Sequence, residues 1–330
     1  MKKPLYIFKS GTLQRKDNTL RIVTDDNVKK DFPIENYDSI YCFGEVSVNT
    51  SLLSYLSQMG ISIHFFNYYG FYTGTFYPRD KNLSGKLIVK QAEYYSDENK
   101  RLYIAQKFID SASYNIYRNL RYYNSRGKNL QPFMDSISEL REMIYKSKSV
   151  SELMGYEGNI RQKYYECWNI IVNQEIDFQK RVKHPPDNMI NSLISYVNSA
   201  VYTATLSEIY KTPLNPTISY LHEPSTRRFS LCLDISEIFK PLIADRLIFS
   251  LLNKNQISEN DFLKDVNMLY MKENARKLVT KEFDNYLSKT IHHKSLDKDV
   301  SYRYLIRLEA YKLIKHFYGE KDYEGFKIWW

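Results

Sequence analysis

The segment PRDKNLSG, residues 78–85, divides the sequence into two parts of different composition. Proline, glycine and asparagine gather in it while apolar residues become few, which is typical of a connection between folded parts. Short apolar runs that end at glycines precede it, and apolar residues at helical spacing follow it. We therefore predict an α+β protein with a small N-terminal β-rich domain at residues 1–78, a linker at 79–90 and a larger all-α domain at 91–330.

The first part is expected to hold short strands and one helix. The turn-prone Lys16-Asp17-Asn18 predicts a hairpin, and apolar runs predict further strands at 5–8, 38–43, 61–66 and 71–77. Apolar residues at 52, 53, 56 and 59 have helical spacing, and Gly60 is a suitable C-terminal stop for that helix.

The second part has the 3.6-residue periodicity of helices from about residue 86 onward. The predicted helical ranges include 132–147, 151–175, 187–211, 236–253, 259–288 and 301–318.

The composition is that of an ordinary globular protein with a basic surplus. Lys and Arg number 47 against 38 Asp and Glu, which gives a net charge of +9 over 330 residues. Such a surplus suits a polyanion such as nucleic acid, because affinity for nucleic acid depends largely on neutralised phosphates. A basic protein without a nucleic-acid partner remains the alternative on charge alone.

The cysteines and the apolar runs bear on the compartment. Cys42, Cys167 and Cys232 form no CxxC pair, so a zinc ribbon or a redox motif is not expected. We expect reduced thiols in a cytoplasmic protein. The chain has neither the apolar run of a signal peptide nor the ~18 apolar residues of a membrane span, so no membrane association is predicted.

The stretch 220–246 is the most informative for chemistry. His222 comes shortly before Arg227 and Arg228, and the acids Asp234 and Glu237 follow. Apolar residues alternate from 229 to 235, which predicts an extended run before a helix. Asp234 and Glu237 also have the spacing of a helix start, in which Asp234 would cap the helix while Glu237 faces a ligand.

A second candidate is Glu157, which lies between Gly155 and Gly158 in a predicted helix. Each glycine costs ~1 kcal/mol relative to alanine in a helix interior, so the close approach of another helix or of a ligand is one reason for the pair. Arg161 follows one turn later. The alternative is an ordinary i, i+4 pair of Glu157 with Arg161.

Together, Glu157, His222 and Glu237 supply two carboxylates and an imidazole. This donor set suits Mg²⁺ or Mn²⁺ better than structural zinc, and the single histidine favours tolerance of Mn²⁺. Nearby cationic side chains would then hold phosphates for metal-assisted displacement at a phosphodiester. Our candidates for contact with DNA are Arg161, Arg227, Arg228 and Lys240. We expect His292-His293 to be solvated and Asp245-Arg246 to be a buried structural pair.

Several segments, in this order, resemble the CRISPR-associated integrase family, the first-numbered Cas protein. The resemblance covers nearly the whole chain and rests on Gly85-Lys86-Leu87, Gln91, Glu157-Gly158, Arg161, 191–196, Leu221-His222-Glu223 and 234–246. Lys240 stands where many members have arginine, which keeps the charge but loses the bidentate geometry.

The resemblance implies a metal-dependent DNA endonuclease and integrase that inserts spacers into a CRISPR array. A DNA 3′-hydroxyl would attack a phosphodiester of the repeat, with Glu157, His222 and Glu237 as metal ligands and Asp234 as a nearby acid. It also implies double-stranded and branched DNA as substrates, a homodimer formed through the β-rich domains, and a small dimeric partner, the second-numbered Cas protein. Two alternatives remain: a non-catalytic nucleic-acid-binding dimer, and a metal-dependent nuclease of another DNA-processing pathway.

Overall fold

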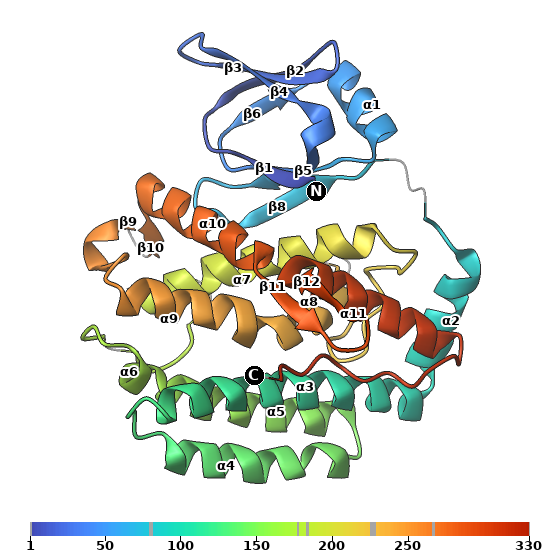
Figure 1. Cartoon of the computed structure of the whole chain (residues 1–330), viewed down its shortest axis with the longest axis vertical. Helices are drawn as coiled ribbons and strands as arrows, with labels where there is room; N and C mark the ends of the chain where they lie inside the picture. Colours follow the sequence, from blue (N-terminus) through green and yellow to red (C-terminus); the bar gives the residue numbers. More distant parts are fainter. Residues whose placement is uncertain are drawn as a thin grey trace. The chain divides into compact units, whose positions relative to one another are not determined.

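The computed structural model describes residues 2–78, 82–176, 178–182, 185–224, 229–265 and 268–329. It divides into two compact units, Met1–Leu83 and Ser84–Trp330 (Figure 1). The division falls within the segment that opened the sequence analysis. Residues 85–90, which we predicted as linker, already belong to helix α2 (Gly85–Ser96), whose N-terminus is capped by the Ser84 side chain.

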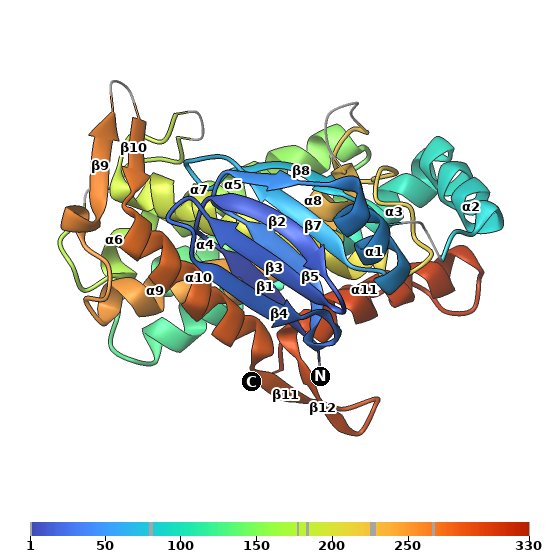
Figure 2. The ribbon, with the colours of Figure 1, turned by 90° about the horizontal axis from the view of Figure 1, so that it is seen from above.

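The first unit contains two four-stranded sheets (Figure 2). In one sheet β1, β5 and β7 run parallel and β8 pairs antiparallel with β7. Its strands are β1 (Lys3–Ile7), β5 (Tyr37–Cys42), β7 (Ser62–Phe66) and β8 (Tyr72–Phe76). The other sheet has the order β4-β3-β2-β6. Its strands are β2 (Gly11–Lys16), β3 (Thr19–Thr24), β4 (Lys29–Pro33) and β6 (Val46–Val48).

Alternation along these strands builds the core of the first unit. In β3 the side chains of Leu20, Ile22 and Thr24 are buried, and their neighbours are less so, as expected for a sheet with one face covered. Helix α1 (Thr50–Met59) adds Leu52 and Leu56 to the same core. The prediction that Gly60 ends this helix is confirmed, since Gly60 has a φ of 70°, a left-handed conformation that glycine adopts without strain.

The second unit is mostly helical. Its remaining helices are α3 (Glu98–Asn124), α4 (Gln131–Glu142), α5 (Val150–Glu166), α6 (Trp168–Ile171), α7 (Met189–Tyr210), α8 (Ser230–Lys240), α9 (Arg246–Asn253), α10 (Glu273–Ser288) and α11 (Tyr302–Phe317). Helices α3, α4 and α5 pack against one another, and α8 packs against α3 and α7 (Figure 1). The predicted α+β class, with a β-rich start and a mostly helical second part, is confirmed.

Two short hairpins interrupt the helical unit, so it is not entirely α-helical. They are formed by β9 (Phe262–Asp265) with β10 (Met268–Met271), and by β11 (Thr290–His293) with β12 (Lys298–Ser301). The helix predicted for 259–288 is therefore wrong in its first half, where a 3₁₀ turn (Glu259–Asp261) and the first hairpin precede α10.

The extended run predicted for 229–235 is also wrong, because α8 begins at Ser230. Nearly every side chain of α8 is buried, from Ser230 to Phe239. A helix that is covered on all sides loses the polar stripe by which helical periodicity is recognised. The local alternation of apolar residues then imitates a strand.

A π-helical segment (Pro241–Asp245) joins α8 to α9. Proline has no N–H to continue the helical hydrogen bonds, so the ladder is disturbed there. Two buried asparagines of α3 donate to carbonyls in this region: Asn115 to Ile238 at 3.0 Å and Asn119 to Pro241 at 2.7 Å. These bonds fix the end of α8, which carries the acids of interest, against α3.

None of the described helices is long and apolar enough to cross a membrane.

Candidate active site

The predicted site residues come from two helices and one loop of the second unit. Helix α8 carries Asp234, Glu237 and Lys240 at intervals of three. Helix α5 carries Glu157 and Arg161, and His222 lies in the segment before α8. Arg227 and Arg228 fall outside the residues that the structure describes.

Asp234 is fully buried and holds the segment that carries His222. One carboxylate oxygen accepts the backbone N–H groups of Tyr220 and Leu221, at 2.7 and 3.0 Å. The other accepts the backbone N–H of His222 at 3.0 Å and contacts its Nδ1 at 2.8 Å. Asp234 is therefore not the N-cap that we predicted: it lies inside α8 and satisfies the backbone of a separate loop.

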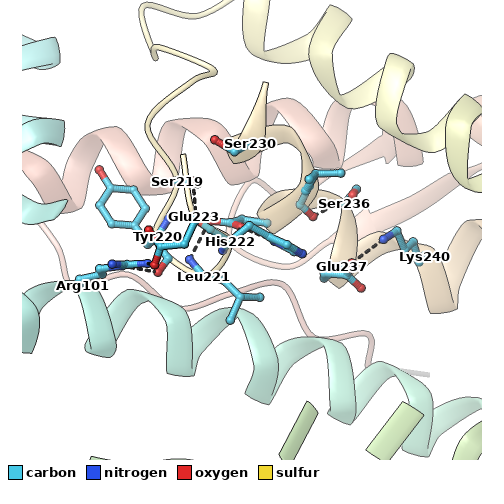
Figure 3. A network of polar contacts seen from close by, with 12 residues as sticks. Arg101, Ser219, Tyr220, Leu221, His222, Glu223, Ser230, Ser236, Glu237 and Lys240 are labelled. Carbon is cyan, nitrogen blue, oxygen red and sulfur yellow. Dashed lines mark hydrogen bonds and ion pairs between the residues drawn. The ribbon is translucent and has the colours of Figure 1, made fainter. Parts of the chain in front are cut away.

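The contact with Asp234 also orients the imidazole of His222. An ionised carboxylate can only accept, so a neutral His222 carries its proton on Nδ1 and keeps the lone pair of Nε2 available. Ser219 donates to the carbonyl of His222 at 2.6 Å, which further fixes this turn. Figure 3 shows the imidazole extending toward Glu237.

Glu237 is buried and contacts two cationic side chains. One oxygen accepts from Arg161 at 2.5 Å. The other accepts from Nζ of Lys240 (Figure 3). Burial would raise the pKa of this carboxyl. The charges of Lys240 and Arg161 outweigh burial and hold the pKa of Glu237 well below its usual range. Glu237 is consequently ionised at neutral pH.

Arg161 links the two predicted carboxylates. Its Nε lies 3.2 Å from an oxygen of Glu157, and its second terminal nitrogen reaches Glu237. The ordinary i, i+4 pair of Glu157 with Arg161 is thus present, but it extends to a third residue from another helix. Arg161 and Lys240, predicted as DNA contacts, are both paired with carboxylates in this structure.

The two glycines beside Glu157 face open space. A Cβ added at Gly155 or Gly158 would meet nothing within 4 Å. Close approach of another part of the described chain therefore does not explain the pair, and the approach of a ligand stays a prediction.

A cavity of about 560 Å³ adjoins these residues. Four of the predicted residues line it: Glu157, Arg161, Glu237 and Lys240. Sequence reasoning missed the other polar residues of its wall, among them Lys180, Arg181 and Asn198. Arg181 donates to side-chain oxygens of Asn191 and Ser195 on α7. Only the segment 191–196, already prominent in the family resemblance, pointed toward this part of the wall.

The donors have the chemistry that a divalent cation requires, but they are not gathered around an ion position. Within the described residues, no group of three or more His, Cys, Asp or Glu side chains is arranged to hold a metal ion. Arg161 and Lys240 instead supply the positive charge beside Glu237. The ionised Glu237 and the imidazole held by Asp234 still match the pattern in which a carboxylate fixes the far nitrogen of a metal-binding histidine.

The neighbouring Asp245 is buried, as predicted. Burial raises its pKa to about 7, although the positive charge of Arg161 acts in the opposite direction. Asp245 therefore lies near Arg161, Lys240 and Glu237 and is only partly ionised at neutral pH.

Comparison with known proteins identifies close relatives of the whole chain. Residues 5–285 match the family described as "CRISPR associated protein Cas1". The "CRISPR-associated endonuclease Cas1" of Fusobacterium nucleatum subsp. nucleatum is 62% identical over 330 residues, which is 100% of this chain and 98% of the relative. The protein of the same name from Clostridium perfringens is 47% identical and is covered completely, as is this chain.

Solved structures agree with this fold. A "CAS1 protein from Thermotoga maritima" is 41% identical, with a TM-score of 0.88 over 98% of this chain and 100% of that one. A "Casposase bound to integration product" has a TM-score of 0.86 over 98% of this chain and 92% of that one, but at 22% identity it shows the likeness of fold alone.

Proposed function

The chain belongs to the Cas1 family of CRISPR-associated proteins, and on that premise we propose that it is a metal-dependent DNA endonuclease and integrase. It would insert spacer DNA into a CRISPR array by the attack of a DNA 3′-hydroxyl on a repeat phosphodiester. We place this reaction in the cytoplasm.

One observation carries the proposal: Arg161 joins Glu157 to Glu237, while the imidazole of His222, held by Asp234, extends toward Glu237 (Figure 3). Two carboxylates and an oriented imidazole from distant parts of the sequence thus share one neighbourhood. The wall of the cavity beside them carries two lysines and two arginines together with three glutamates, and its cations are suited to phosphates.

We propose that Glu157, His222 and Glu237 bind Mg²⁺ or Mn²⁺. When bound, such an ion would polarise the phosphoryl oxygen and stabilise charge on the attacking and leaving oxygens.

The protein's own groups have separate tasks in this proposal. Asp234 holds the imidazole of His222 in one orientation and one tautomer. Glu237 stays ionised through its two cationic neighbours. When Glu237 is used as a ligand, Arg161 and Lys240 become free to contact the phosphate of the DNA. Lysine at 240 would do so as a point charge rather than as a bidentate fork.

The assembly is part of the proposal. We propose a homodimer formed through the β-rich units, which joins a small dimeric second Cas protein and takes double-stranded and branched DNA. The family supports this partner, since structures titled as Cas6-RT-Cas1–Cas2 complexes share the fold, at 19% identity.

The first test is a strand-transfer assay with labelled branched DNA and a repeat-containing target, with and without Mn²⁺. Glu157→Ala, His222→Ala and Glu237→Ala should each reduce joining by roughly 100-fold or more, since loss of an outer contact to a metal ligand alone typically costs about 10–100-fold. Glu166→Ala is the matched control, because Glu166 lines the same cavity but pairs with Lys163.

The two alternatives give different results in this assay. A DNA-binding dimer without catalysis would bind with a steep salt dependence yet leave the DNA intact with Mn²⁺. A nuclease of another pathway would cut the branched DNA without joining it. Full joining by a folded Glu157→Ala protein would refute the assignment of the site.

A further inference from the structure

A second cavity of the helical unit has an unusual charge. It measures about 500 Å³ and is formed by the ends of α3, α9 and α10 together with residues after α6. Among the residues that the structure describes, five cationic side chains and no carboxylate line it. They are Arg126, Lys128, Arg246, Lys254 and Lys289.

The lack of acids sets this cavity apart from its surroundings. Elsewhere in the unit, several half-buried arginines face carboxylates, as Arg141 faces Asp110 and Arg307 faces Glu208. The cavity beside Glu237 contains Glu157 and Glu166 as well as cations. Within the described part of the chain, Arg126, Lys254 and Lys289 have no such ion pair.

The ends of helices offer an alternative explanation for three of these cations. Arg126 follows the C-cap of α3, and Lys254 and Lys289 are the C-caps of α9 and α10. A cation there stabilises the negative end of the helix dipole by ~0.3–1 kcal/mol. That explains each residue separately, but it does not explain why three such ends meet around one hollow.

The cationic side chains of the cavity lie close to one another. Arg126 and Arg246 both lie over the ring of Tyr122, at 4.3 and 5.2 Å from its centre. Burial, followed by the charges of Arg246 and Lys254, lowers the pKa of Lys289, an effect that Glu282 only partly opposes. Mutual repulsion of this kind is relieved when an anion enters.

The cavity is separate from the candidate active site. The two share no lining residue. Phe249, which lines the second cavity, packs against Tyr164 and Trp168 at 6.5 and 4.7 Å between ring centres. A ligand in the second cavity would therefore not touch the carboxylates.

We propose that this basic cavity binds phosphate groups of a DNA strand at a point remote from the reacting phosphodiester. The inference rests on the proposed DNA-binding function, but not on its catalytic step. A site separate from the carboxylates would hold the DNA strand and set its direction while the candidate active site acts on another phosphate.

The test measures the binding of a labelled DNA oligonucleotide in EDTA by fluorescence anisotropy over a range of salt concentrations. The double variant Lys254→Gln/Lys289→Gln is compared with Lys146→Gln/Lys148→Gln, which removes the same charge from two exposed positions outside the described cavities. We expect the first variant to bind about tenfold more weakly at low salt. Its slope of log affinity against log salt should fall by about 1.4–1.8, for two lost phosphate contacts.

The control variant should lose at most about twofold, because salt screens charges beyond ~10 Å. Equal weakening in both variants, or a lower unfolding midpoint in the cavity variant with unchanged DNA affinity, would overturn the proposal in favour of helix-end stabilisation.

Inorganic phosphate distinguishes the two sources of the anion. Suppose that millimolar phosphate raises the unfolding midpoint of the wild type but not of the cavity variant, and that the two proteins bind DNA equally well. The site then takes a free anion, and the DNA proposal is wrong. Since every measurement is made in EDTA, loss of the proposed integrase activity in other experiments would leave this result unaffected.

Discussion

The carboxylate of Asp234 holds the loop that carries His222 in place. Three backbone N–H groups and one ring nitrogen converge on it from residues 220–222. The residue anchors this loop to helix α8 and at the same time fixes the face that His222 presents.

Asp234→Asn should therefore weaken Mn²⁺ binding and DNA joining together, by about 10–100-fold. An amide can satisfy only part of these donors, because its NH₂ group opposes the remaining ones. Calorimetric titration with Mn²⁺ measures the first effect and the strand-transfer assay the second.

Glu223→Gln is the control for that change. Glu223 belongs to the same loop but is largely exposed, where it pairs with Arg101 at 2.6 Å. Such a pair contributes at most about 1 kcal/mol, so Mn²⁺ affinity should stay near that of the wild type. Unchanged Mn²⁺ affinity in the Asp234 variant would contradict the role given to its carboxylate.

Asp245 predicts a dependence of stability on pH. Its pKa is about 7 in the folded protein and lies near the ordinary value when unfolded. The folded state thus holds an extra proton in the acid range, so this stabilisation is complete at low pH and disappears as the pH rises through 7.

The free energy of unfolding of the wild type should fall by about 2–3 kcal/mol from pH 5 to pH 8, at 1.36 kcal/mol for each pH unit from 5 to 7. Asp245→Asn lacks this proton, so its stability relative to the wild type should rise by the same amount. Denaturant unfolding at the two pH values measures this. Asp110→Asn is the opposite case: burial would raise its pKa, but Lys327 and Arg141 hold that pKa below the usual value. Asp110 is therefore ionised at both pH values, and the Asp110→Asn variant should lose the same amount of stability at each.

Residue types suggested Glu157, His222 and Glu237 only as a set, because each of them alone has an ordinary structural explanation, and their role as ligands stays a prediction. Their partners were harder to predict. Arg161 was recognised beside Glu157 from its spacing, but its contact with Glu237 depends on the packing of α5 near α8, which no local pattern contains.

At the scale of elements, exposed faces decided which helices could be predicted. Helix α1 has a capping asparagine, an apolar stripe and a terminal glycine, and the sequence indicates all of it but the exact start. Helix α8 lacks a polar stripe since it is buried on all sides, so its first half was predicted as extended. Ser258 and Asp261 form a capping box, a typical helix start, yet only a 3₁₀ turn follows before β9 pairs with β10.

The two glycines of α5 separate a structural role from a role in binding. Each faces open space, so Gly155→Ala and Gly158→Ala should both stabilise the helix by ~0.5–1 kcal/mol. Only Gly158 lines the cavity beside Glu237. If DNA approaches the backbone there, Gly158→Ala should bind it about tenfold more weakly and Gly155→Ala should not. Equal DNA affinities would show that neither glycine serves a ligand.

The whole molecule is predicted to be a dimer. With a chain mass of 39.3 kDa, sedimentation equilibrium should give twice that value, independent of added Mn²⁺. Single-chain mass at micromolar concentration would contradict the proposed association through the β-rich units. The boundary between the two units, at residues 83 and 84, lies inside the predicted linker 79–90, where apolar spacing changes from short runs to helical intervals.

The guanidinium of Arg161 between Glu157 and Glu237 has a consequence for how the proposed ion would be taken up. With Lys240, it balances the buried negative charge of Glu237 in the absence of a metal. We therefore expect the chain to fold in a metal-poor cell, and binding of the proposed ion would exchange one cation for another. Unlike a zinc finger, which is unfolded without its metal, this protein should survive stripping by a chelator and be reloaded afterwards with a different ion.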